Sequence, residues 1–480
     1  MKVQQLIWIL AALAFFLPNQ NHSADAWDYA GGLQHGFDLF EPHHLLHNIP
    51  AWLVQQLFIA TNIKVEAMAL MCLLNALYGV FVLQVLVTIF RRRGLSDIQL
   101  FPLVLLAGAS WGMLRFMSEN ETYVLPILFS ILGINALEKA KQSGQPLYWA
   151  GFWLAFACLF HQLQVWWWFA ALVMVITYNK KKVIAYILPA LVVPIGYLLV
   201  HFFVWEKPFT VEALSTSFFQ VLVEGNLATV NLSSTFLLWL AAIGRSVLQI
   251  HGYMLMLPGL DMKWYLAFGV LPLAFLYLVW QLWKSRKQIK IMVQPLGWIL
   301  PVLLLAFSFY SGGNAEFLVG LPIALLLWLQ PTLEGNTFRN FALWVLAWNV
   351  SLGLAPLNKY EFQPFQQEAQ FVNDNADSFY ISDYSAEINA ILTYKNGLDG
   401  AIVRPGKVGV ASDNTLEMDI ALAFQQGKRV YTSSLNTLPL SRAGYLATSD
   451  AWWKSYRLQS RTTLVFAGQT WTVWELFPRK

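Results

Sequence analysis

The sequence predicts a multi-pass α-helical membrane protein with about eleven transmembrane helices, followed by a small extracytoplasmic α/β domain. Of its 480 residues, 57% are hydrophobic and only 12% are charged, whereas a soluble globular chain carries about 25% charged residues. The mean hydropathy is +0.50. Apolar segments recur as far as residue 356, and the chain becomes more polar beyond that point. We therefore expect a transmembrane domain at 1–356 and a second domain at 357–480.

The apolar segments approach the roughly 20 residues that a helix needs to cross about 30 Å of hydrocarbon. Basic residues cluster in every second connection, which the positive-inside rule places in the cytoplasm. The alternate connections, with the loops 19–63 and 204–263 among them, are then external, and so is the C-terminal domain. Within the second loop, 235–257 is expected to lie along the membrane surface or to re-enter it partly. The eleven segments are 4–18, 65–90, 98–117, 123–138, 147–161, 163–178, 183–203, 264–283, 294–310, 317–332 and 341–356.

The first segment has two interpretations. Leu6 to Pro18 has the length of a signal-peptide core and follows Lys2. The residues before Asp25 read Asn21-His22-Ser23-Ala24, which is a poor cleavage site, so we favour a retained helix. The loop that follows is external in both cases.

Charge and cysteine content exclude other classes of protein. The formal net charge is only +4 and the lysines and arginines lie in short loops, so the basic excess indicates topology and not nucleic-acid binding. Cys72 and Cys158 lie inside apolar segments, where a thiol packs as a hydrophobe. No disulfide or thiol metal site is expected.

The C-terminal region alternates short strand-like and helix-like segments, which is typical of an α/β domain. A strand is expected at 378–382, a helix at 415–424, and a hairpin at 461–475 that closes at Ala467-Gly468-Gln469. The region has no Gly-rich phosphate loop, metal-ligand spacing or nucleophile elbow. We interpret it as a lid or docking module.

Asp25 and Asp28 are three residues apart at the external end of the first helix. One helical turn places both carboxylates on one side, beside the membrane surface. Such a pair suits base chemistry on a hydroxyl group, because one carboxylate accepts the proton while the other tunes it. The alternative is that both are ordinary solvated loop residues.

Other external turns carry ionisable residues. Arg115 lies in the third apolar segment, where an arginine costs about 2.5–3.5 kcal/mol on insertion scales, so we expect it to pair with Glu119 or to meet an anionic ligand. The next turn holds Glu121 and Tyr123, and His161 follows the fifth segment. A further outer turn, Gly312-Gly313-Asn314-Ala315-Glu316-Phe317, contains a single acid.

The histidines of the opening loop allow two readings. His43 and His47 at positions i and i+4 share a face if the segment is helical, and with His44 and Asp38 they are candidate ligands of Zn²⁺ or Mn²⁺. In the other reading, Pro42 opens an interfacial helix whose histidines hydrogen-bond to lipid headgroups or to the acids. No spacing here is diagnostic of a metal, so no cofactor is required and a divalent ion stays optional.

Four short motifs lie in order on the external side of roughly the first 165 residues: Asp25-x-x-Asp28, Pro42-His43-His44-Leu45-Leu46, Glu121-x-Tyr123-x-Leu125 and His161. Their order and sidedness resemble protein O-mannosyltransferase-like membrane proteins, which belong to the GT-C glycosyltransferases. The expected topology and outer C-terminal domain agree with that resemblance. The family usually pairs Asp with Glu where this chain has two aspartates, which leaves open which of them corresponds to the catalytic acid.

The resemblance implies transfer of a sugar from a polyprenyl-phosphate donor to an acceptor hydroxyl, on the outer face of a bacterial inner membrane. Asp28 is then the first choice for the general base, with Asp25 as its partner. Two competing classes are a transporter or flippase, supported by prolines inside spans, and a structural membrane subunit. The residues expected to bind substrate or its phosphate are Arg115, Arg245, His161, Glu121, Tyr123, His43 and His44.

Overall fold

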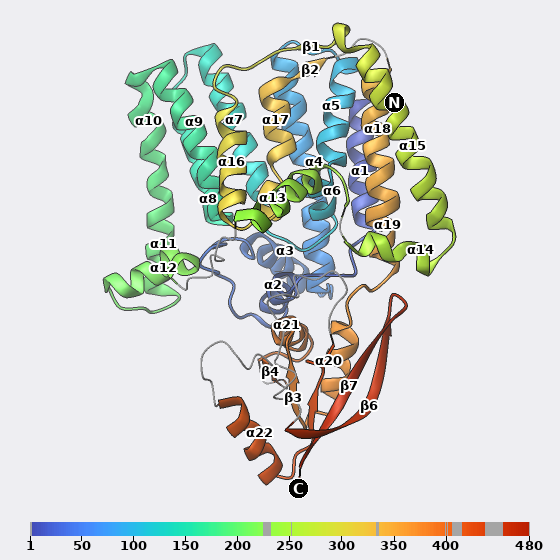
Figure 1. Cartoon of the computed structure of the whole chain (residues 1–480). Coiled ribbons are helices and arrows are strands. Elements are labelled where there is room, and N and C mark those ends of the chain that lie inside the picture. The colour runs from blue at the N-terminus through green and yellow to red at the C-terminus, as the bar shows by residue number, and fades with distance from the viewer. Residues whose placement is uncertain are drawn as a thin grey trace.

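A helical bundle forms most of the chain, and a smaller α/β domain is attached to one end of it (Figure 1). The computed structural model describes residues 2–223, 232–250, 252–332, 336–398, 400, 402–405, 415–436 and 455–479. Residues 224–231 and 251 of the expected outer loop therefore lie outside the described residues. Between the bundle and the domain lie α2 (Ala24–His35) and α3 (Ile49–Ala60) (Figure 1). The other helices up to residue 359 are α1 (Val3–Phe16), α4 (Ala67–Arg92), α5 (Asp97–Ala109), α6 (Trp111–Met117), α7 (Val124–Ser143), α8 (Tyr148–Phe160), α9 (Val165–Tyr178), α10 (Val183–Ile187), α11 (Val192–Phe203), α12 (Val211–Val223), α13 (Leu232–Val247), α14 (Leu257–Leu260), α15 (Lys263–Lys284), α16 (Ile299–Tyr310), α17 (Leu321–Leu329), α18 (Thr337–Asn349) and α19 (Ala355–Lys359).

Each of the eleven apolar segments coincides with a helical segment of the structure. Among the described residues, four helical segments are long and apolar enough to cross a membrane on their own: Ala67–Arg92, Lys180–Phe203, Lys263–Lys284 and Thr337–Lys359. The number rises to six if each of two bent helix pairs counts as one span. The other apolar helices are shorter, so the count of eleven crossings stays a prediction.

The two bent pairs are broken where the predicted third segment and the predicted re-entrant stretch lie. The α5 and α6 axes meet at 66°, and Thr235–Val247 meets Gly252–Leu260 at 76°. Backbone groups freed by such breaks need partners in an apolar environment. The buried side chain of Asn349 supplies them at both places, since its Nδ2 donates to Ala109 O at 2.7 Å and to Val247 O at 2.8 Å. Its Oδ1 also accepts from the N–H of Gln249 at 2.8 Å.

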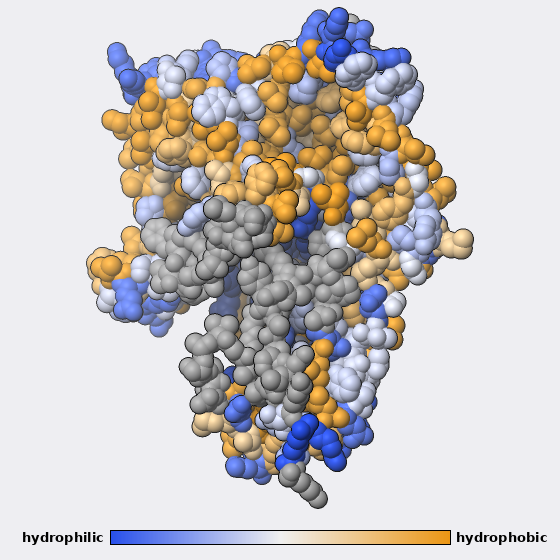
Figure 2. Space-filling model, in the orientation of Figure 1, coloured by the Kyte–Doolittle hydropathy of each residue, from blue (hydrophilic) through white to orange (hydrophobic). Residues whose placement is uncertain are grey.

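The basic connections meet at the end of the bundle opposite the C-terminal domain. Arg93 at the end of α4 pairs with Glu138 of α7 and donates to Leu327 O of α17 at 2.8 Å, which joins three helices far apart in the sequence. The short antiparallel ribbon of β1 (Lys290–Ile291) and β2 (Pro331–Thr332) lies at the same end (Figure 1). Figure 2 shows a broad apolar surface on the visible face of the bundle, below this hydrophilic end. This distribution is that expected of a membrane-embedded bundle.

A five-stranded sheet with the order β4-β3-β5-β7-β6 forms the centre of the C-terminal domain. β3 pairs in parallel with β4 and β5, whereas β7 pairs antiparallel with β5 and β6. The hairpin turn is Ala467-Gly468, where the sequence places it. The elements are α20 (Phe365–Asp374), β3 (Phe379–Ser382), α21 (Ser385–Asn396), β4 (Val403–Pro405), α22 (Thr415–Gln425), β5 (Val430–Thr432), β6 (Tyr456–Phe466) and β7 (Gln469–Pro478).

Helix α21 of the C-terminal domain packs against α2. The two helices approach so closely that a Cβ on Gly31 would lie 3.4 Å from the Cα of Tyr394. The Trp27 and Tyr394 rings are 5.1 Å apart, and His35 Nε2 lies 2.9 Å from Tyr394 O. The helix that carries Asp25 and Asp28 is thus held between the bundle and the C-terminal domain.

Candidate active site

The α2 helix presents both aspartates one turn apart, as the sequence predicts. Ser23 is its N-cap, and its Oγ accepts from the N–H of Ala26 at 3.0 Å, which satisfies a free donor of the first turn. Asp25 lies in that first turn, where the helix dipole favours a negative charge. Both aspartates are exposed, so a substrate group can reach them.

Four acids gather around this helix face. The pKa of Asp28 is raised to about 6, first because the surrounding protein removes part of its hydration and then by the charges of Asp25 and Asp38. The pKa of Glu41 is raised to about 7 by burial and by the same three aspartates. Burial also raises the pKa of Asp25, against a smaller opposing effect of His43. A carboxylate with a pKa near 6 is ionised at neutral pH and still basic enough to accept a proton from a hydroxyl group.

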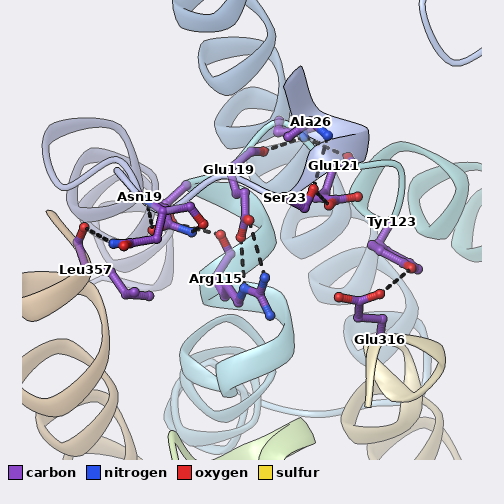
Figure 3. A network of polar contacts seen from close by, with 12 residues as sticks. Asn19, Ser23, Ala26, Arg115, Glu119, Glu121, Tyr123, Glu316 and Leu357 are labelled. Atoms are coloured by element: carbon purple, nitrogen blue, oxygen red, sulfur yellow. Dashed lines mark hydrogen bonds and ion pairs between the residues drawn. The ribbon is translucent and has the colours of Figure 1, made fainter. Parts of the chain in front are cut away.

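The turn between α6 and α7 is clamped against α2. Asn75 Nδ2 donates to Glu119 O and Glu121 O at 2.8 and 2.9 Å, and Asn120 Nδ2 donates to Ala26 O at 2.7 Å. Ser23 Oγ, which caps α2, donates to Glu121 Oε1 (Figure 3). The Glu121 side chain is therefore fixed to the same point that starts the aspartate helix. Burial, followed by the charges of Glu316, Glu119 and Asp25, raises the pKa of Glu121 well above its usual range.

Arg115 pairs with Glu119, which is the partner expected from the sequence. Arg115 Nε donates to Glu119 Oε2 at 2.8 Å, and its Nη2 donates to Oε1 at 3.3 Å. The Glu119 side chain is fully buried and that of Arg115 is 19% exposed. This pairing offsets the insertion cost of the arginine and leaves part of its guanidinium accessible.

Arg115 and Arg245 line one cavity of about 110 Å³. A water needs about 10–15 Å³ by the same measure, so the cavity has room for several water-sized groups, which is enough for a phosphoryl group. Two arginines with amide and hydroxyl groups around them are a suitable environment for a phosphate. The remaining lining residues are Asn19, Asn21, Trp111, Gln249, Tyr253, Leu357, Phe362 and Gln363.

Glu316 joins the site, although the sequence offered it only as a lone acid in an outer turn. The Tyr123 hydroxyl donates to Glu316 Oε2 at 3.3 Å across 193 residues of sequence. Glu316 is among the charges that act on both Glu121 and Arg115. Figure 3 shows it across from the Arg115 guanidinium, next to Tyr123. The only feature of the sequence that indicated a role for Glu316 was its position on the predicted external side.

The expected helix over the histidines is absent, which corrects the sequence prediction. Residues 42–48 form turns, and α3 begins only at Ile49. The backbone of the segment is bound elsewhere, because His43 O accepts from the N–H of Gln162 and Pro42 O accepts from the Tyr197 hydroxyl. His43 and His47 therefore do not share a helix face.

The histidines instead meet neighbouring rings edge to face. His44 lies 4.4 Å from the His161 ring, and His47 lies 4.8 Å from the Tyr29 ring. Burial lowers the pKa of His47 and of His161 to about 3, so both are neutral at pH 7. Within the described ranges, no group of three or more His, Cys, Asp or Glu side chains is placed to hold a metal ion.

The structure thus brings the predicted residues together in two adjoining parts. Asp25, Asp28, Glu121 and Tyr123 lie on the α2 side, together with the histidines. Arg115 and Arg245 line the cavity on the other side of the turn that carries Glu119. His161 packs against Tyr123 and does not line the arginine cavity. The sequence predicted that His161 binds the phosphate, but its ring is neutral at pH 7 and can offer only a hydrogen bond.

Comparisons with known proteins find matches among solved structures. No protein-family model and no curated protein matches the sequence. Five solved chains match it in structure. One of them is the crystal structure of ArnT from Cupriavidus metallidurans bound to undecaprenyl phosphate. It is 11% identical to this chain with a TM-score of 0.43, and the match covers 98% of this chain and 97% of ArnT.

Proposed function

We propose that the protein is a GT-C type glycosyltransferase, which moves a sugar from a polyprenyl-phosphate donor to an acceptor hydroxyl at the external face of the membrane. The observation that carries this proposal is the cavity shared by Arg115 and Arg245. On the same end of the bundle, α2 carries Asp28, whose pKa of about 6 suits a base. One part of the site suits a phosphate and the other suits proton removal. A lipid-linked donor also explains why the site lies at the end of an apolar bundle, since its tail stays in hydrocarbon.

In the proposed reaction, the acceptor oxygen forms a bond to the anomeric carbon as the bond between that carbon and the phosphate oxygen breaks. An aspartate of α2 takes the acceptor proton, which is general base catalysis. Arg115 and Arg245 stabilise the negative charge that grows on the departing polyprenyl phosphate. Arg115 does not have to move for this step, because Glu119 holds it in place.

Asp28 is our choice for the base and Asp25 for its partner. Asp28 is exposed, has a pKa of about 6, and feels the charge of Asp25. The charge of Asp25 acts on both Asp28 and Glu121. The reverse assignment remains the alternative, and separate variants distinguish the two.

A transporter or flippase is the second candidate, and the broken helices favour it. Transporters build their sites from interrupted helices, and here Arg115 and Arg245 both lie in broken helix pairs. A carrier needs the arginines but does not need a carboxylate base. The effect of removing the aspartates therefore separates the two functions.

The test is sugar transfer by the purified full-length chain from a panel of polyprenyl-phosphate sugars, with candidate acceptors supplied as an extract of the source membrane. Asp28→Asn should lose at least a hundredfold in turnover while it binds the donor normally, and Asp25→Asn should lose less. Glu212→Gln, a change of an exposed carboxylate on α12, serves as the matched control. Turnover unchanged in both aspartate variants would refute the transferase mechanism and direct attention to lipid-linked transport.

A further inference from the structure

The turn Gly312–Phe317 holds Glu316 in a fixed position relative to the arginine cavity. Gly312 and Gly313 have φ angles of 74° and 76°, which side chains rarely adopt. A Cβ on Gly313 would lie 2.6 Å from the backbone N of Trp239 in α13, the helix that carries Arg245. Asn314 Oδ1 accepts from the N–H of Glu316 at 3.0 Å and completes the turn. The turn is therefore packed directly on an arginine-bearing helix.

Glu316, Tyr123 and His161 form one continuous set of polar side chains. Tyr123 donates its hydroxyl to Glu316, and its ring centroid lies 5.1 Å from that of His161. Tyr123 is buried, whereas Glu316 is half-buried. The set extends to Glu121, which feels the charge of Glu316. These four side chains come from three separate loops of the bundle.

His161 has a buried nitrogen that points to a ligand. Its Nδ1 accepts from the N–H of Leu163 at 3.1 Å, so the ring proton of the neutral histidine lies on Nε2. His161 is only 7% exposed, and its Nε2 has no hydrogen-bond partner among the residues that the structure describes. Buried donors are nearly always paired in proteins. The rings of His44 and Tyr123 pack against His161, and a hydroxyl oxygen of a bound molecule can accept from this N–H.

The reaction geometry places the sugar beside this set. The anomeric carbon is one oxygen away from the phosphate, and it must also lie within reach of the base. It therefore lies between Arg115 on one side and Asp25 and Asp28 on the other. Glu121 is bound to Ser23, the N-cap of the helix that carries both aspartates. Glu316 accepts from Tyr123, and its charge acts on both Arg115 and Glu121. Figure 3 shows Glu121, Tyr123 and Glu316 on one side of Arg115, with Asn19 and Leu357 on the other.

We propose that Glu121, Tyr123, His161 and Glu316 bind the transferred sugar, and that they restrict the donor to uncharged, hydroxyl-bearing sugars. This inference rests on the proposed function and names its substrate class. The two carboxyl groups accept hydrogen bonds from sugar hydroxyls, and His161 Nε2 donates one. Glu316 is thus a specificity-determining residue.

The same side chains exclude sugars that carry a carboxylate. The charges of Glu316, Glu119 and Asp25 act on Glu121, and of these Glu119 is paired with Arg115. A uronic acid would bring a further negative charge close to Glu316 and Asp25, where the low dielectric screens it poorly. Arg115 already binds Glu119 and, in the proposed reaction, faces the donor phosphate, so it does not neutralise the uronate. Repulsion of the wrong ligand is a common source of specificity.

The experiment measures binding of three short-chain lipids to the full-length protein in nanodiscs: a polyprenyl phosphate, its hexose derivative and the matching hexuronic acid derivative. The two sugars differ only in the oxidation state of C6, and binding needs no knowledge of the acceptor. We expect the hexose lipid to bind at least tenfold more tightly than the hexuronic acid lipid. Glu316→Gln should weaken hexose binding and reduce the ratio below threefold.

Tyr123→Phe is a second variant, which keeps the buried aromatic ring and removes the hydroxyl that contacts Glu316. It should weaken hexose binding without affecting the bare lipid, and Glu212→Gln should change neither. Equal affinity of the wild type for the two sugar lipids overturns the inference while leaving the proposed function intact. A failure to bind any polyprenyl phosphate overturns the proposed function, and the inference with it.

Discussion

Asn349 is the side chain whose replacement should disturb the arginine cavity most, although it contacts none of the proposed ligands. Its three hydrogen bonds satisfy the backbone at the breaks after Ala109 and after Val247. Asn349→Leu has nearly the same size but leaves two carbonyl groups and one N–H without their partner. Each buried group left unpaired costs about 1–3 kcal/mol.

The loss of stability in Asn349→Leu should lie toward the lower end of the range that three unpaired groups would give. Gln249, whose N–H loses its acceptor, also lines the arginine cavity, so water can reach part of the break. We therefore expect a loss of about 3–5 kcal/mol in the free energy of unfolding. The loss of activity should be larger than the loss of stability alone implies, because a displacement of a catalytic group by about 1 Å can reduce catalysis about a hundredfold.

The assay is thermal and denaturant unfolding of the full chain in detergent, together with binding of a bare polyprenyl phosphate. Asn349→Asp is informative because it keeps the acceptor for Gln249 and loses both donors. Asn396→Leu is the control, since Asn396 is exposed and its single bond goes to Asn373. Unfolding of Asn349→Leu within about 0.5 kcal/mol of this control, the usual range of surface changes, would refute the role of Asn349.

Three further predictions address the base, the C-terminal domain and the Glu316 turn. The rate constant kcat/KM should rise about tenfold per pH unit below the Asp28 pKa of about 6 and level off above it. Because Asp25→Asn removes a negative charge, the inflection of this pH profile should move to lower pH, and an unmoved inflection would contradict the assignment of Asp28 as the base. Burial raises the pKa of Glu368 from 4.5 to about 7, so the folded state keeps the Glu368 proton at pH values where the unfolded state has lost it. The free energy of unfolding should therefore fall by about 3 kcal/mol between pH 4.5 and 7 and stay level above pH 7. Melting of Glu368→Gln measured across the same pH range should show no such decline. Gly313→Ala should destabilise the chain by about 1–3 kcal/mol through its positive φ and its clash with α13, while the control Gly269→Ala, in open space within α15, should be neutral or stabilising by up to about 1 kcal/mol.

Local features predicted much of the architecture. All eleven apolar segments are helical because a long apolar run satisfies its backbone most easily as a helix. The Arg115–Glu119 pair follows from i, i+4 spacing, and the hairpin turn follows from the Ala467-Gly468 pattern between two strand-like runs. Asp25 and Asp28 share a helix because Ser23 caps it.

The histidine segment was predicted wrongly for a reason that lies outside it. Its spacing fits a helix, but its carbonyl groups bind Gln162 and Tyr197, which come more than 100 residues later. The helix break at Ala109 depends in the same way on Asn349, 240 residues away. Partners at such separations leave no periodic trace in the sequence.

The sequence by itself therefore determined the class of protein, the apolar segments, the distribution of basic loops and the presence of acids on one side. Those properties depend on composition and on neighbours within a few residues. Only the tertiary structure decided that Arg245 shares a cavity with Arg115, that Glu316 meets Tyr123, and that His161 lies with the acids. These are contacts between separate helices and turns, and they arise because packing, capping and buried hydrogen bonds must be satisfied together across the whole bundle.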